Sequence, residues 1–362
     1  MVQLCYSEKS MSFFAPASCS EQHETRRLRS WPILGVGQAM RLFLLLICAL
    51  TFACDFASAR SVAIVNLAGS LVDIAQSSTS TDDRIVAMEK LVLSHQDIFS
   101  RFVSPEGLRS ACRTYVARLE VQLPGLRRLS DDISLRALLE RDVSDFERAH
   151  PGFDRSKVRI LLLPSLGYFR GQARPISGQL TLMLDLEFLS TAEPRAFRAM
   201  FHHELFHIYH YQVRPEVGAE AEVALDHGKF PSLATLLWVE GMATCATREL
   251  NPGASDADLA IDVVARSDER FWTLLEIAIA QLLSTGQEAI SGFFYFPRPD
   301  NSVPVDSGYR IGEALIRASR SGQTWDHLLS LSHSQLVETL RASAQALSHT
   351  RKRPNKAPEP TP

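Results

Sequence analysis

Two histidines and a glutamate lie within five consecutive residues of the chain. His203, Glu204 and His207 form the pattern His-Glu-x-x-His. In an α-helix, side chains at positions i and i+4 share a face, so His203 and His207 can ligate one metal ion. Glu204, beside the first histidine, can then take a proton from a water molecule that the metal activates. These residue types at this spacing predict metal-assisted hydrolysis with Glu204 as general base.

A helix that begins near Pro194 is expected to carry this motif. Proline suits the first turn of a helix, and the stretch from Ala196 to Val213 contains no helix breaker. Bulky apolar residues around the histidines predict a partly buried helix, in which imidazoles need a polar or metal partner. The alternative is a solvated helix face that carries these histidines, together with His202 and His210, by chance. The role of His210 stays open.

A catalytic zinc ion usually takes three protein ligands and leaves a fourth position for water. In a metzincin, the third ligand would be a histidine six residues after His207, with a glycine between the two. In this chain those positions hold Val213 and His210. The metzincin class is therefore excluded.

A second helix, which Ser232 can cap, is expected to carry the segment Leu237-Trp238-Val239-Glu240-Gly241-Met242-Ala243. With this segment and the His-Glu-x-x-His helix, the chain resembles bacterial zinc peptidases of the gluzincin type. In those thermolysin-like enzymes a glutamate of a Trp-x-Glu-Gly-x-Ala element completes the metal site. The resemblance covers roughly residues 159–315 and implies that Glu240 is the third ligand, while Gly241 lets two helices approach closely.

Other residues are alternative candidates for the third metal ligand. Asp226 and His227 lie near the loop distance at which thermolysin-like enzymes place their glutamate, but Asp226-His227-Gly228 is typical of a turn between helices. Glu216, Glu220 and Glu222 are weaker candidates, and we expect them to form a solvated acidic face.

The resemblance implies an α+β fold that is mainly helical, with a zincin-like core built from a short β-sheet and an active-site helix. It implies one Zn²⁺ per chain, bound by His203, His207 and Glu240. The segment from Gly308 to Gly312 opens a further helix, and related enzymes often carry a similar Tyr-x-x-Gly segment there. Tyr309 is therefore a candidate donor to the oxyanion of the reaction, with a packed tyrosine as the alternative.

Hydrophobic periodicity supports the same organisation. From about residue 80 to residue 150, apolar residues recur at spacings of three and four, which predicts helices. Val158 to Leu163 and Leu180 to Leu189 are predicted strands, and the turn-rich stretch between Gly167 and Gly178 indicates a hairpin or two neighbouring strands. By analogy with other zincins, the strand from Leu180 to Leu189 is expected to pair with an extended substrate.

The amino end predicts export. Residues 42–54 form an apolar run that follows Met40-Arg41 and precedes Ala57-Ser58-Ala59, which together are typical of a signal peptide cleaved near Ala59. A periplasmic or secreted location is expected, and a retained membrane anchor is the less favoured interpretation. The expected organisation is an upstream extension with signal peptide (1–59), a helical N-terminal region (60–150), a metallopeptidase domain (151–348) and a disordered tail (349–362).

Composition limits the partners. The chain has 38 Lys and Arg against 41 Asp and Glu, a formal net charge of −3, which argues against nucleic-acid binding. Of six cysteines, only Cys112 and Cys245 follow the expected cleavage site, and they form either one disulfide or two separate buried thiols.

The expected activity is zinc-dependent hydrolysis of peptide bonds, with a peptide or protein as substrate. Two alternatives stay open: a zinc hydrolase of a non-peptide bond, and a non-catalytic exported binding protein on a zincin scaffold. Glu204 argues against the second alternative, because a purely structural zinc ion has no use for a base beside its ligand.

Overall fold

The computed structural model describes residues 61–77, 80–100, 102–217, 231–261, 264, 268–286, 290, 292–294 and 303–351. All of them belong to one compact unit, Ala57–Pro362. The expected signal peptide lies outside the described residues, as does the chain beyond Arg351. The disordered tail was expected to begin at residue 349, but the last described helix continues to Arg351. Among the described residues, none of the helices combines the length and the apolar character that crossing a membrane requires.

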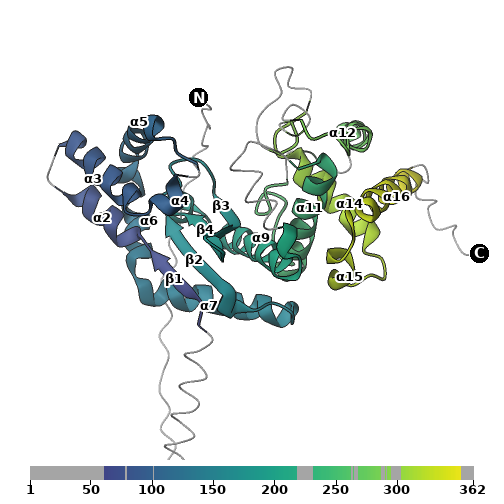
Figure 1. Cartoon of the computed structure of the whole chain (residues 1–362), viewed down its shortest axis with the longest axis horizontal. Helices are drawn as coiled ribbons and strands as arrows, with labels where there is room; N and C mark the ends of the chain where they lie inside the picture. Colours follow the sequence, from purple (N-terminus) through teal and green to yellow (C-terminus); the bar gives the residue numbers. More distant parts are fainter. Residues whose placement is uncertain are drawn as a thin grey trace, which may run out of the picture. The chain divides into compact units, whose positions relative to one another are not determined.

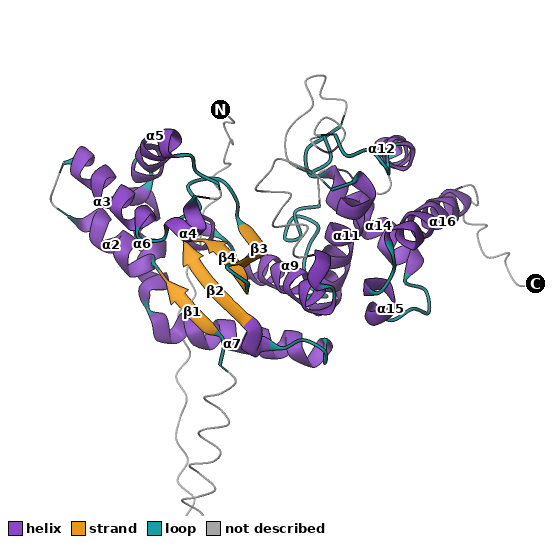
Figure 2. Ribbon diagram, viewed as in Figure 1, coloured by secondary structure: helices purple, strands orange, loops and turns teal. Residues whose placement is uncertain are grey.

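Helices make up most of the described chain, and one small mixed sheet accompanies them (Figures 1 and 2). The predicted α+β, mainly helical class is confirmed. The strands are β1 (Ala63–Asn66), β2 (Val158–Leu163), β3 (Gly171–Ile176) and β4 (Gln179–Asp185). The helices are α2 (Ala68–Gln76), α3 (Thr81–Leu93), α4 (Gln96–Phe99), α5 (Pro105–Val116), α6 (Leu119–Ser130), α7 (Asp132–Ala149), α8 (Leu186–Thr191), α9 (Pro194–Val213), α11 (Leu233–Leu250), α12 (Glu269–Ala280), α14 (Ser307–Ser319), α15 (Trp325–Leu329) and α16 (His333–Arg351).

The predicted helical character of the segment before residue 150 is confirmed, and serine caps define two of its helices. The Ser80 hydroxyl accepts from the backbone N–H of Asp83, whose carboxylate accepts from the Ser80 N–H in return, so a capping box starts α3. Ser104 is likewise the N-cap of α5, and its hydroxyl accepts from the backbone N–H of Gly107. The same segment also contains β1, which the sequence patterns did not predict because four residues are too few to show a period.

The sheet has the strand order β1-β2-β4-β3. β1 and β4 lie parallel to β2 on its two sides, and β3 pairs antiparallel with β4. A two-residue turn at Ser177 (φ 51°) and Gly178 (φ 80°) joins β3 to β4 in a hairpin. The two predicted strands, β2 and β4, are neighbours in the sheet but lie parallel, and β3, inside the turn-rich stretch between them, was not predicted. Since β1 pairs with β2, the residues before and after position 150 contribute to a single sheet.

The strand predicted from Leu180 to Leu189 is wrong in two respects. It ends at Asp185, whose carboxylate accepts from the backbone N–H of Phe188 at 3.1 Å and so starts α8. It also lies inside the sheet, between β2 and β3, so both of its edges are already paired. It therefore cannot pair with an extended substrate, and the outer edge on this side of the sheet belongs to β3.

The two outer edges of the sheet differ. On β1, the N–H of Val62 donates to the Glu140 carboxylate at 3.1 Å, and Arg136 donates to the carbonyl of Ile64 at 3.4 Å. Side chains of α7 thus occupy the edge of β1, as natural proteins do to prevent unwanted pairing. β3 instead lies against α9, the helix that carries the histidine motif.

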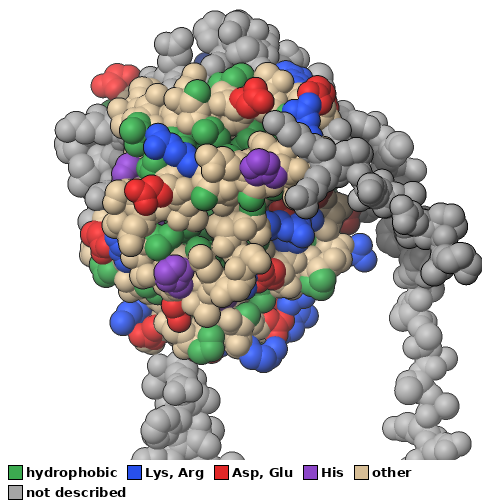
Figure 3. All heavy atoms as spheres, turned by 90° about the vertical axis from the view of Figure 1, so that its right-hand side faces the viewer, with side chains coloured by type: hydrophobic (Ala, Val, Ile, Leu, Met, Phe, Trp, Pro, Cys, Tyr) green, Lys and Arg blue, Asp and Glu red, His purple; other side chains and the backbone are tan. Residues whose placement is uncertain are grey.

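The two described cysteines and the distribution of surface charge can be compared with the sequence. Cys112 and Cys245 are both buried free thiols, so they do not form a disulfide. On the face drawn in Figure 3, basic and acidic side chains are interspersed, with small hydrophobic areas between them. This mixture agrees with the near-zero net charge.

Candidate metal centre

The predicted helix around the histidine motif is α9. It starts with Pro194 in its first turn and runs without interruption to Val213. One side of α9 packs on β3 and β4, and α11 crosses it on another side. This burial holds the motif between the sheet and a second helix.

The second predicted helix is α11, which carries Glu240. Ser232 caps it, as expected, by accepting from the backbone N–H of Thr235 at 3.2 Å. The backbone N–H groups of Leu233 and Ala234 donate to carbonyls just beyond α12, which satisfies further donors at this helix end. Glu240 lies two turns inside α11, on a rigid segment.

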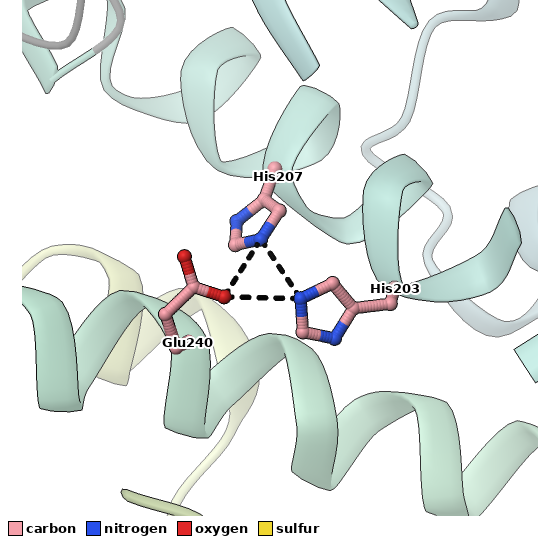
Figure 4. Close-up of side chains that lie close together, drawn as sticks. All are labelled: His203, His207 and Glu240. Carbon is pink, nitrogen blue, oxygen red and sulfur yellow. Dashed lines mark hydrogen bonds and ion pairs between the residues drawn. The ribbon is translucent and has the colours of Figure 1, made fainter. Parts of the chain in front are cut away.

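Three ligand atoms from α9 and α11 meet at one point (Figure 4). Nε2 of His203 lies 3.0 Å from Oε2 of Glu240, and Nε2 of His207 lies 3.3 Å from the same oxygen. The two Nε2 atoms lie 3.1 Å apart. The structure thus brings together all three residues that the sequence indicated as ligands.

The chemistry of this donor set fits zinc. Two imidazole nitrogens and one carboxylate oxygen match the ligand types of catalytic zinc sites. Tetrahedral coordination with bonds of about 2.0–2.2 Å separates ligand atoms by about 3.3–3.6 Å. The observed separations of 3.0–3.3 Å are slightly shorter than these values, so a small outward movement of the side chains would let the three atoms surround one ion.

The carboxyl groups of Glu240 and Glu204 differ in their pKa values. Burial by itself raises the pKa of Glu240, but the neighbouring His207 and His203 outweigh it and hold that pKa well below its usual range. For Glu204, burial raises the pKa to about 7, with a further increase from Glu240, while His203 opposes it. Glu240 is therefore a permanent anion suited to a ligand, and Glu204 exchanges a proton near neutral pH.

Glu204 is held against the edge strand. Its carboxylate accepts a hydrogen bond from the backbone N–H of Ala173. A Cβ at Gly171 would lie 2.8 Å from Cγ of Glu204, so only glycine permits this approach. Neither contact was foreseen from the sequence, although the Gly-x-Ala stretch of a short edge strand is the kind of small-residue pattern that allows it.

The outer edge of β3 presents backbone groups beside Glu204. The N–H of Asp185 donates to the carbonyl of Arg170 at 2.8 Å, so residues 170, 172, 174 and 176 face β4 in the alternating antiparallel pattern. Gly171 and Ala173 consequently direct their backbone groups away from β4. No strand pairs with this edge among the described residues.

A third helix, α14, packs against α11 through two glycines. A Cβ at Gly241 would lie 2.5 Å from the carbonyl carbon of Gly312, and a Cβ at Gly312 would lie 2.5 Å from the carbonyl oxygen of Leu237. The close approach expected at Gly241 is confirmed, and its partner is the glycine of the Tyr-x-x-Gly segment. Because the backbones touch here, α14 can lie close to the metal ligands.

Tyr309 lies near the metal-binding group. It belongs to the first turn of α14, which begins at Ser307 as the sequence indicated, and it is half-buried. The centroid of its ring lies 6.0 Å from that of His203 and 5.3 Å from that of Phe294. The candidate tyrosine is therefore beside the ligands, although its position alone does not assign it a chemical role.

A buried ion cluster also fixes α14 on α11. Glu313 is 2% exposed and accepts from Arg248 at 2.7 Å, from Arg310 at 3.1 Å and from Arg317 at 3.3 Å. Three cations around one buried carboxylate satisfy its charge within the low-dielectric interior. Sequence reasoning missed this cluster, because residues 65 positions apart give no local signal.

The neighbouring histidines do not join the metal-binding group. His202 is fully buried, contacts the Asn251 amide at 3.0 Å and has its pKa lowered to about 4, chiefly by burial. His210 is also buried, and burial followed by the charge of His207 lowers its pKa to about 3. Both are buried residues of α9 whose lowered pKa values favour the neutral imidazole, so His210 does not lie on a solvated helix face.

Of the rival third ligands, Glu216 is the one that the structure describes, and it does not belong to the group. Glu216 is exposed and pairs with Arg214. Asp226, His227 and the glutamates at positions 220 and 222 lie outside the described residues.

Comparison with known proteins adds no relative: no protein-family model matches the chain, and neither a curated protein nor a solved structure matches it. The class of this protein is therefore defined by its fold and its candidate metal site alone. The chain is a mainly helical α+β protein in which two histidines of one helix and a glutamate of the next can hold a metal ion.

Proposed function

We propose that the chain is a zinc-dependent peptidase of the gluzincin type. The observation that carries the proposal is the convergence of His203 Nε2, His207 Nε2 and Glu240 Oε2 within 3.3 Å, with the buried carboxylate of Glu204 beside them. A zincin-like core is part of the proposal. It is supported by the small sheet whose antiparallel edge strand lies on the motif helix.

Zinc held by these three residues supplies Lewis-acid polarisation of a carbonyl and makes a nearby water molecule more acidic. The remaining chemistry belongs to the chain. Burial raises the pKa of the Glu204 carboxyl group to about 7, so this group is suited to accept a proton from water and to return one to a leaving amine. Its bond from the Ala173 N–H keeps the carboxylate pointed toward β3 while it does so.

The edge strand supplies a place for an extended peptide. The N–H and C=O of Gly171 and the C=O of Ala173 face away from β4, next to Glu204. A peptide that adds to this edge forms main-chain hydrogen bonds regardless of its sequence. These bonds would hold a scissile bond beside Glu204, which favours a peptide over a substrate that lacks a regular backbone.

Tyr309 is the candidate for stabilising the developing oxyanion. Its ring lies beside His203 and comes from α14, whose position the glycine contact and the ion cluster fix. A phenol directed to this charge would donate a hydrogen bond that is stronger in the transition state than in the ground state.

Metal analysis and a substrate panel test the proposal together. After dialysis against metal-free buffer, the chain is expected to retain about one zinc ion, counted by elemental mass spectrometry. With zinc bound, it is expected to cleave unstructured peptides, and matched esters in the panel separate a peptidase from a hydrolase of other bonds. Folded protein that neither retains nor takes up zinc would refute the proposal, as would zinc-loaded protein that cleaves only esters.

A further inference from the structure

An exposed aromatic surface lies just before β3. Tyr168 is 51% exposed, although it is a large hydrophobic residue. Its ring lies 6.1 Å from that of Phe102, which packs edge-on against Phe169 at 5.3 Å and against the buried Phe99 at 5.9 Å. We call Phe102 and Tyr168 the aromatic pair. Aromatic rings that are exposed and supported from behind are typical of binding surfaces.

The loop that presents Tyr168 is rigidly held. The N–H of Ser165 donates to the buried carboxylate of Asp185 at 2.8 Å, and the hydroxyl and carbonyl of Ser165 accept from Gly167 and Tyr168, both at 3.1 Å. Leu166 (φ 56°) and Gly167 (φ 87°) adopt left-handed backbone conformations within this turn. An ordered loop loses little entropy when a ligand binds, so the aromatic pair is organised in advance.

The aromatic pair is close to the proposed reaction site along the chain. Tyr168 precedes Gly171 by three residues, and Gly171 lies directly on Glu204. Because residues 168 and 170 lie in bends rather than in a strand, the chain from Tyr168 to Gly171 spans less than the distance of about 10 Å that three extended residues cover. Arg170 lies between Tyr168 and Gly171 in the sequence. Burial raises the pKa of Asp306, and the charge of Arg170 opposes this rise, so Asp306 at the start of α14 also lies near this loop. A peptide on the outer edge of β3 that continues past Gly171 therefore passes over this loop.

We propose that Phe102 and Tyr168 bind a large apolar side chain, preferably an aromatic one, of an extended peptide. This inference rests on the proposed peptidase function and specifies its substrate class. The bound side chain belongs to a residue within about three positions of the scissile bond, because at most three residue lengths separate Tyr168 from Gly171, which lies on Glu204. The occupant is a peptide segment, because Tyr168 lies three residues before the strand whose outer edge presents main-chain groups beside Glu204.

Binding measurements test this inference separately from catalysis. The probes are acetylated heptapeptides of alanine and glycine in which one phenylalanine occupies each position in turn. The protein is the full chain with Glu204→Gln, which prevents turnover, and calorimetry gives Kd. One phenylalanine position is expected to lower Kd about tenfold relative to the peptide without phenylalanine, as one aromatic contact of about 1.4 kcal/mol predicts.

The variants identify the aromatic pair as the cause. Adding Tyr168→Ala should remove most of that tenfold gain, whereas Tyr168→Phe, which retains the ring, should preserve it. Ile133→Ala is the matched control, because Ile133 is an exposed apolar side chain (84% exposed) on α7. Equal affinity for all the peptides, or a gain that survives Tyr168→Ala, would overturn the inference.

Cleavage by the unmutated chain tests the function independently. If the gain in binding is present and the scissile bond of the same peptides lies within about three residues of the phenylalanine, both proposals hold. A binding gain without cleavage of any peptide would refute the peptidase and leave the aromatic surface as a peptide-binding site. Cleavage without a binding gain would refute only the aromatic surface.

Discussion

At the scale of single residues, two glutamates show how environment divides roles. Glu240 lies beside two imidazoles that favour its ionised form, so it is suited to hold a metal ion. Glu204 is the more deeply buried of the two, and burial raises its pKa to about 7 although the charge of His203 opposes this rise. The same type of side chain thus ionises differently because its surroundings differ.

This division predicts different losses from the two residues. Glu204→Gln should retain one zinc per chain but lower kcat/KM for peptides by at least about 100-fold, since it removes the general base. Glu240→Ala should lose the metal itself, because only two ligands remain. Elemental mass spectrometry and steady-state kinetics measure both effects. Equal zinc loss in the two variants would contradict the separation of roles.

Tyr309 offers a second test at this scale. If its hydroxyl stabilises the transition state, Tyr309→Phe should lower kcat about 10- to 100-fold with KM and zinc content unchanged. If the tyrosine only packs against Phe294 and His203, the variant should keep its kcat, because the ring contacts are retained.

At the scale of elements, the crossing of α11 and α14 determines the site. Two glycines allow contact between the backbones, and the buried Glu313 with its arginines fixes how the helices are aligned. Glu240 belongs to one helix and Tyr309 to the other, so the crossing places ligand and candidate donor relative to each other.

Adding one methyl group at this crossing should destabilise the protein. Gly312→Ala forces a Cβ to within 2.5 Å of the Leu237 carbonyl, and backbone atoms cannot move aside cheaply. We expect a loss of about 1–3 kcal/mol in the free energy of unfolding, measured with urea. Gly69→Ala is the matched control, because it lies in α2 with no atom within 4 Å of the added Cβ. It should be neutral or slightly stabilising.

At the scale of the whole molecule, α7 and α15 enclose a histidine behind the motif helix. His150 is 5% exposed and lies among the rings of Phe146 at 4.5 Å, Tyr209 at 5.3 Å and Phe206 at 5.5 Å. Burial, followed by the charge of Arg320, lowers its pKa from 6.5 to about 4. The folded protein therefore keeps this imidazole neutral.

The sign of this shift predicts sensitivity to acid. The unfolded chain protonates His150 near pH 6.5, whereas the folded chain does so only near pH 4, so stability falls as pH decreases through this window. His150→Leu cannot titrate. The unfolding free energy of the native chain minus that of the variant should therefore decrease by about 2–3 kcal/mol between pH 7 and pH 4. Urea titrations at several pH values measure it, and a constant difference would contradict the prediction.

The predicted export determines where the mature chain would begin. Cleavage near Ala59 would leave Val62, which is 3% exposed and bonded to Glu140, and the whole of β1 in the mature chain. Protein recovered from the periplasm or medium is therefore expected to begin near Arg60, as N-terminal sequencing would show. A chain that stays in the cytoplasm with its first 59 residues intact would contradict the signal peptide.

The sequence alone determined the parts of the site that depend on local geometry. His203, Glu204 and His207 lie on one helix, and the helical period by itself places both imidazoles on one face. The helix after Ser232 was likewise predictable from its cap, and the helix that contains Gly308 was expected to continue through Leu315. Glu240 required the resemblance to gluzincins as well, because its distance from the motif in the sequence does not determine its distance in space.

Only the tertiary structure decided which strand lies at the edge and which groups surround each carboxylate. Analogy with zincins placed the strand from Leu180 to Leu189 where it could pair with a substrate, but sheet order depends on long-range pairing, and β3 is the edge strand. The pKa of Glu204 depends on the approach of Gly171 and Ala173 from that strand. Local periodicity places side chains on the faces of single elements, whereas burial and charge arise only when distant elements pack together.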